Sequence, residues 1–107
     1  MLMQLSDQWV LVTGGARGLG AAISRAVAGT GAGVVINYLQ SEQAAHALAA
    51  ELGPRAIALQ ADVTDKAAVQ RLFDEAQQRC GAPISAVVNN ALAQFQFDGD
   101  ARPQLAD

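Results

Sequence analysis

The chain has 107 residues, of which 51% are hydrophobic and 16% are charged, and its formal net charge is −3 at pH 7. This balance predicts one small globular domain and excludes a disordered chain. The negative charge gives no electrostatic basis for binding nucleic acid or an anionic membrane, so we expect neither partner. No apolar run approaches the roughly 20 residues of a membrane helix, and the N-terminus does not resemble a secretion signal. With a single cysteine we expect no disulfide, no metal site and a cytoplasmic location.

Four short apolar runs alternate with three longer segments of helical periodicity. We expect strands at 9–12, 33–37, 56–59 and 84–88, because runs that are apolar throughout are typical of parallel strands covered on both faces. The intervening helices have apolar stripes at helical spacing. These stripes are Leu19, Ala22, Ile23, Ala26 and Val27 in the first, Ala45, Leu48, Ala49 and Leu52 in the second, and Val69, Leu72, Phe73, Ala76 and Cys80 in the third.

The helix ends have their own signals. Ser41 is a good N-cap for the second predicted helix, and Thr64 or Asp65 caps the third. Glycines end all three helices, because a residue without a Cβ takes the backbone angles that a helix C-terminus requires. The element boundaries are therefore predicted to within a few residues.

The order of strands and helices predicts an α/β fold, a Rossmann-type doubly wound parallel sheet with strand order 3-2-1-4. Residues 1–91 would form a partial dinucleotide-binding domain, and residues 92–107 a loop or the start of a missing second half. A sheet that stops at its fourth strand exposes an apolar edge. We therefore expect a domain truncated after that strand, which needs another segment or chain to cover it.

The main chemical signal is Thr13-Gly14-Gly15-Ala16-Arg17-Gly18-Leu19-Gly20, between the first strand and the first helix. A diphosphate binds at this place in a fold, because free backbone N–H groups and the positive helix end point toward it. Gly14 would permit the tight turn, Gly18 the approach of the phosphates, and Gly20 close packing of the helix on the strand. We expect backbone amides from Gly14 to Gly20 to face the diphosphate. The candidate cofactor residues here are Gly14, Ala16, Arg17, Gly18, Leu19 and Gly20.

This segment resembles the Thr-Gly-x-x-x-Gly-x-Gly motif of the short-chain dehydrogenase/reductase family. Asp62-Val63 after the third strand and Asn89-Asn90-Ala91 after the fourth also match that family's pattern. The resemblance implies that Asp62 binds the adenine amino group, that the backbone of Val63 contacts the ring, and that Asn90 and Ala91 support the sheet and meet a ribose. Taken alone, Asp62 could also be a helix-start carboxylate, and the asparagines could be turn residues.

The end of the second strand bears on the choice of cofactor. An NAD site usually places an acid there for the ribose hydroxyl, whereas this chain has Asn37-Tyr38-Leu39 and no acid before Glu42. Arg17 can pair with a 2′-phosphate, and Ser41 can add a hydroxyl donor. We therefore expect NADP rather than NAD, with Asn37, Tyr38 and Ser41 at the site. The alternative for Arg17 is a solvated surface charge.

The resemblance implies hydride transfer to or from a small-molecule carbonyl or alcohol, by a homo-oligomer when complete. It is nearest to the 3-oxoacyl-acyl-carrier-protein reductase branch. The family's catalytic Tyr-x-x-x-Lys motif has no match, because the only tyrosine, Tyr38, has no lysine at that spacing. We assign no catalytic residue and expect the 107 residues alone to be inactive. Leu92 stands where the family usually has glycine, and a leucine side chain there would crowd the nicotinamide ribose or force a different loop path.

Two other functions remain open from the sequence. One is a non-catalytic module that binds a dinucleotide and acts as a sensor. The other is an S-adenosylmethionine-dependent methyltransferase, which also has a glycine loop after its first strand. That class requires an acid at the end of the second strand, and residues 37–40 supply none.

Overall fold

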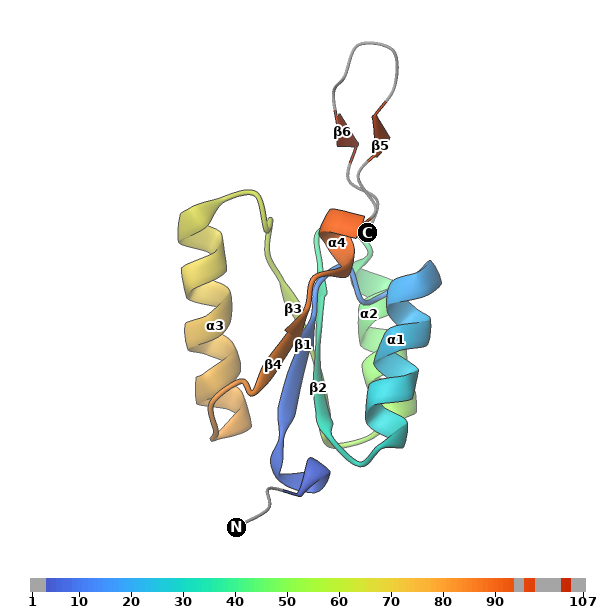
Figure 1. Ribbon diagram of the computed structural model, residues 1–107, viewed down its shortest axis with the longest axis vertical. Helices are drawn as coiled ribbons and strands as arrows, with labels where there is room; N and C mark the ends of the chain where they lie inside the picture. The colour runs from blue at the N-terminus through green and yellow to red at the C-terminus, as the bar shows by residue number, and fades with distance from the viewer. Residues whose placement is uncertain (1–3, 94–95, 98–102, 105–107) are drawn as a thin grey trace.

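The computed structural model describes residues 4–93, 96–97 and 103–104 (Figure 1). Its elements, in chain order, are η1 (Leu5–Asp7), β1 (Trp9–Val12), α1 (Gly18–Gly29), β2 (Gly33–Tyr38), α2 (Glu42–Leu52), β3 (Ala56–Gln60), α3 (Lys66–Cys80), β4 (Ala86–Val88), α4 (Asn90–Ala93), β5 (Gln96–Phe97) and β6 (Pro103–Gln104).

The first four strands form one parallel sheet in the order β3-β2-β1-β4. Leu11, in the middle of β1, lies opposite Val35 of β2 and Val87 of β4. The predicted α/β class and the strand order 3-2-1-4 are therefore confirmed. This order brings the ends of β1, β2 and β3, and the loops that follow them, to one edge of the sheet.

Helices cover both faces of this sheet, with α1 and α2 on one side and α3 on the other (Figure 1). Alternate strand residues divide between two buried clusters, as the pleat of a strand requires. Val12, Val34 and Ile36 belong to the cluster beneath α1 and α2. Leu11 and Val35 belong to the cluster beneath α3. All six residues of β2 are buried, so this strand contributes to the core on both faces of the sheet.

The buried face of α1 differs from the predicted stripe. Leu19 is 62% exposed, and Ala22 and Ala26 are also exposed. The buried residues are instead Gly20, Ala21 and Ser24. The predicted stripe is right for Ile23 and Val27, which are partly buried against the cluster beneath α1 and α2. It is wrong for the other three residues, because α1 also approaches the sheet through small side chains.

The stripes predicted for α2 and α3 are buried or half-buried, with Ala68 in addition on α3. Asp65 rather than Thr64 is the N-cap of α3, and its Oδ1 accepts hydrogen bonds from the amides of Ala67 (3.0 Å) and Ala68 (3.4 Å). Ser41 holds the N-cap position of α2, but its side chain makes no capping hydrogen bond. Gly81 ends α3 with a φ of 69°, in the left-handed region that glycine favours.

The last part of the chain begins with an exposed strand. Ala86 and Val87 of β4 are exposed, Val87 by 46%, and β1 is its one neighbour among the described strands. Residues 92–107 were predicted as a loop or the start of a missing second half. Within the described part of this range, α4 extends to Ala93, and β5 and β6 pair antiparallel. Residues 94–95, 98–102 and 105–107 lie outside the described part. Among the described residues, no helix has the length and hydropathy needed to cross a bilayer.

Candidate cofactor site

The turn between β1 and α1 is built on two glycines that contact each other. Gly14 has a φ of 57°, which a residue with a Cβ rarely adopts. A Cβ at Gly20 would lie 1.9 Å from the carbonyl oxygen of Gly14, so only glycine fits there. The backbone angle of Gly14 and the close contact at Gly20 agree with the predicted tight turn and close helix packing. They bring the start of α1 directly against the end of β1.

The first backbone N–H groups of α1 have no intrahelical hydrogen-bond acceptor. Arg17 is the N-cap, and its carbonyl accepts the first intrahelical hydrogen bond, from the amide of Ala21 at 3.1 Å. The amides of Gly18, Leu19 and Gly20 precede that bond, so they are the helix-start donors available to an anion. Gly18 has a φ of 54°, and no atom lies within 4 Å of the place a Cβ would take. A ligand can therefore approach this backbone closely.

The amides of Gly14 and Gly15 are already occupied. Gly14 N donates to Oδ1 of Asn37 at 3.3 Å, and Gly15 N donates to the backbone carbonyl of Asn37 at 2.9 Å. The expectation that amides from Gly14 onward face a diphosphate is therefore wrong for the first two. Gly14 shapes the turn, and the donors begin further along the loop. Ala16 is buried within that loop, and Leu19 is exposed beside it.

A hydrogen-bonded network joins this turn to the end of β4. Nδ2 of Asn90 donates to the Gly14 carbonyl at 3.0 Å, and the amide of Ala91 donates to Oγ1 of Thr13 at 3.0 Å. Asn90 and Ala91 are both almost completely buried. Oδ1 of Asn90 is buried and has no hydrogen-bond partner among the described residues. A buried carbonyl oxygen without a donor is costly, which makes this atom a candidate acceptor for a ligand hydroxyl.

Arg17 and Ser41, from two different loops, line one pocket of about 580 Å³. Its other lining residues are Gln40, Glu42, Gln43 and Ala44. The structure thus brings together the two residues predicted to bind a 2′-phosphate. The carboxylate of Glu42, at the first position of α2, also lines this pocket, where its negative charge would repel a bound phosphate.

Asn37 and Tyr38 do not lie as the sequence suggests. Asn37 is 2% exposed and its side-chain amide points at backbone groups, so it is not open to a cofactor. Tyr38 is 6% exposed, in the cluster beneath α1 and α2, with its ring edge against His46 at 5.8 Å between centroids. Burial, and then the charges of Glu42 and Glu75, raise the pKa of Tyr38 above its ordinary value of 10.0.

Asp62 and Val63 follow β3 at the same edge of the sheet. Oδ1 of Asp62 accepts from the hydroxyl of Thr64 at 2.6 Å and from its amide at 2.9 Å. These two hydrogen bonds hold the pKa of the Asp62 carboxyl below its ordinary value. Val63 lines a cavity of about 390 Å³ with mostly apolar neighbours, among them Phe73 and Val87. The Asp62 carboxylate is thus fixed in its orientation beside an apolar cavity.

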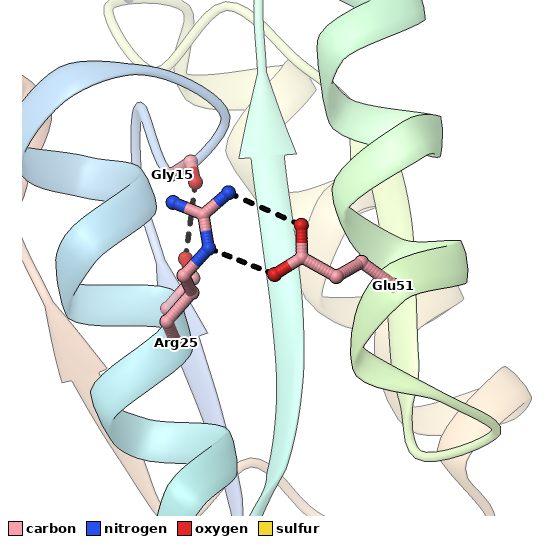
Figure 2. A network of polar contacts seen from close by, with 4 residues as sticks. Gly15, Arg25 and Glu51 are labelled. Atoms are coloured by element: carbon pink, nitrogen blue, oxygen red, sulfur yellow. Dashed lines mark hydrogen bonds and ion pairs between the residues drawn. The ribbon is translucent and has the colours of Figure 1, made fainter.

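An ion pair joins helices α1 and α2, which flank the pocket lined by Arg17 and Ser41 (Figure 2). Nε of Arg25 on α1 lies 2.8 Å from one oxygen of Glu51 on α2, and a second nitrogen lies 3.2 Å from the other. Arg25 lowers the pKa of Glu51 through this hydrogen-bonded contact. One residue before Arg25, the hydroxyl of Ser24 donates to the carbonyl of Gly15 at 3.0 Å. The spacing of α1 and α2 is therefore linked to the glycine turn.

The sequence analysis missed three contributors to this region. Thr13 was assigned no role, although its hydroxyl connects the turn to Ala91. A hydroxyl residue at the start of the glycine segment is the signal that could have identified it. Ser24 is fully buried within α1, although the predicted apolar stripe of that helix does not include it. Glu42 lines the same pocket as Arg17 because the starts of α1 and α2 lie near each other, and no local sequence pattern indicates this.

Comparison with known proteins agrees with this geometry. The sequence profile described as short chain dehydrogenase matches residues 8–102. The chain is 42% identical over 95 residues to elsinochrome reductase 1 of Elsinoe fawcettii, covering 86% of this chain and 36% of that protein. It is 45% identical over 89 residues to sorbitol dehydrogenase of Cereibacter sphaeroides, covering 83% and 34% of the two chains.

A solved structure is similar in both fold and sequence. The FolM alternative dihydrofolate reductase 1 of Brucella canis, complexed with NADP, superposes with a TM-score of 0.78 at 34% identity. The match covers 90% of this chain and 38% of that one. The chain thus spans less than two fifths of the length of each of these three proteins.

Proposed function

Because the chain belongs to the short chain dehydrogenase family, we propose that it forms the cofactor-binding part of an NADP(H)-dependent oxidoreductase. The observation that carries this proposal is the start of α1. There the amides of Gly18, Leu19 and Gly20 precede the first intrahelical hydrogen bond, and the space above Gly18 is open. Such a helix start binds a diphosphate without any charged side chain. The NADP bound to the Brucella canis relative supports the same cofactor here.

The residues around this helix start fit a dinucleotide along its length. Arg17 and Ser41 would hold a 2′-phosphate in the pocket between α1 and α2. Asp62, fixed by Thr64, would accept a hydrogen bond from the adenine amino group, with Val63 against the ring. Oδ1 of Asn90, which has no partner among the described residues, would accept a hydrogen bond from a ribose hydroxyl. When bound, NADPH would supply a hydride to a carbonyl, or NADP⁺ would accept one from an alcohol, and this chain would orient the cofactor.

The substrate is proposed at the level of the family only, as a small-molecule carbonyl or alcohol. The two relatives compared above carry the names of a reductase and a dehydrogenase with different substrates. The 3-oxoacyl branch, the homo-oligomer and the cytoplasmic location stay predictions from the sequence. We assign no catalytic role to any described side chain. The contact of Leu92, which lies in α4, with the nicotinamide ribose also stays a prediction.

Calorimetric titration of the whole protein with NADPH and NADH tests the cofactor. We expect NADPH to bind more tightly, and Arg17→Ala to weaken NADPH binding by about ten- to a hundredfold, as expected for loss of a charge-assisted hydrogen bond. The same change should leave NADH binding nearly unaltered. Arg71→Ala is the matched control, since Arg71 is also exposed but lies on α3.

Three outcomes would count against the proposal. Equal binding of both cofactors, or an unaltered preference in Arg17→Ala, would remove the 2′-phosphate site. Absence of any binding would remove the dinucleotide site itself. Tight NADPH binding by the whole protein without oxidation or reduction of any carbonyl or alcohol would favour the non-catalytic module.

A further inference from the structure

Asn37 joins two segments that come from different strands. It lies near the end of β2, is 2% exposed, and receives both of the first two amides of the glycine turn. Gly14 N donates to its Oδ1 at 3.3 Å, and Gly15 N to its backbone carbonyl at 2.9 Å. On the other side, its Nδ2 donates to the carbonyl of Ala61 at 3.2 Å and lies 3.4 Å from that of Leu59. Ala61 directly precedes Asp62.

We propose that Asn37 is a positioning residue that sets the glycine turn and the Ala61–Asp62 segment relative to each other. This inference rests on the proposed function, in which these segments bind opposite parts of one cofactor. Asn37 would not contact the cofactor. It would fix the distance between the turn that presents the phosphate donors and the carboxylate that accepts from adenine, so that both engage one ligand at once.

The chemistry of the side chain explains why this position requires an amide. The amide oxygen accepts from Gly14 N while the amide nitrogen donates to backbone carbonyls, so acceptor and donor are both used in a buried place. An aspartate of the same shape would keep the acceptor and lose the donor. Its charge would also face the carbonyl oxygens of Leu59 and Ala61. Leucine would lose both contacts and leave the Gly14 amide without its acceptor.

The position is also distinct from the choice between NADP and NAD. The sequence places Asn37 where an acid would select NAD, but the structure turns its side chain into the fold. The pocket residues Arg17, Ser41 and Glu42 come instead from the starts of α1 and α2. A change at Asn37 is therefore expected to weaken NADPH and NADH alike, whereas a change at Arg17 alters their ratio.

The test uses the whole protein with the variants Asn37→Asp and Asn37→Leu, and NADPH and NADH as probes. We expect each variant that folds to lose about ten- to a hundredfold in affinity for both cofactors, because small displacements of binding groups have effects of this size. Val35→Ala is the matched control. Val35 is a fully buried residue of the same strand, on the same face, with no polar group in its side chain. Its truncation should lower the melting temperature and leave cofactor affinity unaltered.

A double-mutant cycle separates positioning from plain stabilisation. If Asn37 places Asp62, the losses from Asn37→Asp and Asp62→Ala should not add, and the coupling should reach about threefold or more. Additive losses, or wild-type affinity in Asn37→Asp, would overturn the inference while the wild-type titration still supports the proposed function. Absence of wild-type binding would overturn both.

A measurement on the unaltered protein covers the case in which neither variant folds. The side-chain amide protons of Asn37 should exchange slowly with solvent both with and without NADPH, since their acceptors are backbone carbonyls of the fold. Rapid exchange in the free protein would overturn the inference.

Discussion

The α carbon of Gly20 faces the carbonyl oxygen of Gly14, the same oxygen that accepts a hydrogen bond from Nδ2 of Asn90 at 3.0 Å. A Cβ at position 20 would also lie 2.7 Å from that Nδ2. The start of α1, the end of β1 and the start of α4 therefore meet at one point with no space between them. This contact is the basis of the first stability prediction.

Gly20→Ala should destabilise the protein by on the order of 3 kcal/mol, because its Cβ would meet rigid backbone that cannot move aside without displacing α1. The free energy of unfolding from urea titration measures the effect. Gly29→Ala, on the same helix, is the control, since a Cβ there meets nothing within 4 Å. That change should be neutral or stabilise by less than about 1 kcal/mol. Equal stability of the two variants would show that the turn is not tightly packed.

Glu42→Gln should tighten NADPH binding by roughly threefold and change NADH binding less. The carboxylate of Glu42 lines the same pocket as Arg17 and would repel a 2′-phosphate through solvent, so its removal favours the more charged cofactor. The effect should shrink as salt is raised, because exposed charges are screened. The ratio of the two dissociation constants at two ionic strengths measures it. A weaker preference for NADPH would show instead that Glu42 orients Arg17 or a ribose.

The phenol of Tyr38 should titrate at higher pH in the folded than in the unfolded protein. Burial is the main cause of its raised pKa, and Glu42 adds to it. A raised pKa means that the folded state favours the neutral phenol. Its contribution to stability is complete below about pH 10 and is lost as pH rises through the folded-state pKa. The difference in ultraviolet absorbance between wild type and Tyr38→Phe isolates this group.

Two results would test the causes of that shift separately. Glu42→Gln should lower the pKa of Tyr38 slightly, because the charge is the smaller cause. An unshifted pKa in the wild-type protein would show that the ring is accessible to water.

The sheet could be predicted from sequence because its strands are short and apolar throughout. Val34, Val35 and Ile36 identify a strand buried on both faces, and the intervening helices leave few possible topologies. The roles of Gly14 and Gly20 also followed from spacing alone, since the φ of one and the close contact of the other allow only glycine.

The rest depended on which way individual side chains turn. Asn37 ends the predicted second strand and Tyr38 follows it, and both were expected to lie open to the cofactor. β2 extends to Tyr38, and pairing with β3 buries both. The face of α1 was predicted only in part. Ile23 and Val27 pack against the core as expected, but Leu19 is exposed and small residues such as Ser24 are the buried ones. Asp65 rather than Thr64 caps α3, and the Thr64 hydroxyl instead donates a hydrogen bond to Asp62.

The pairing of β1 with β4 has a consequence for the site as a whole. Their parallel register holds Val88, near the end of β4, opposite Val12, which directly precedes the glycine turn. α4 follows β4 immediately, and it brings Asn90 and Ala91 with it. A shift in the register between β1 and β4 would therefore move the proposed ribose acceptor on Asn90 away from the proposed phosphate donors at the start of α1.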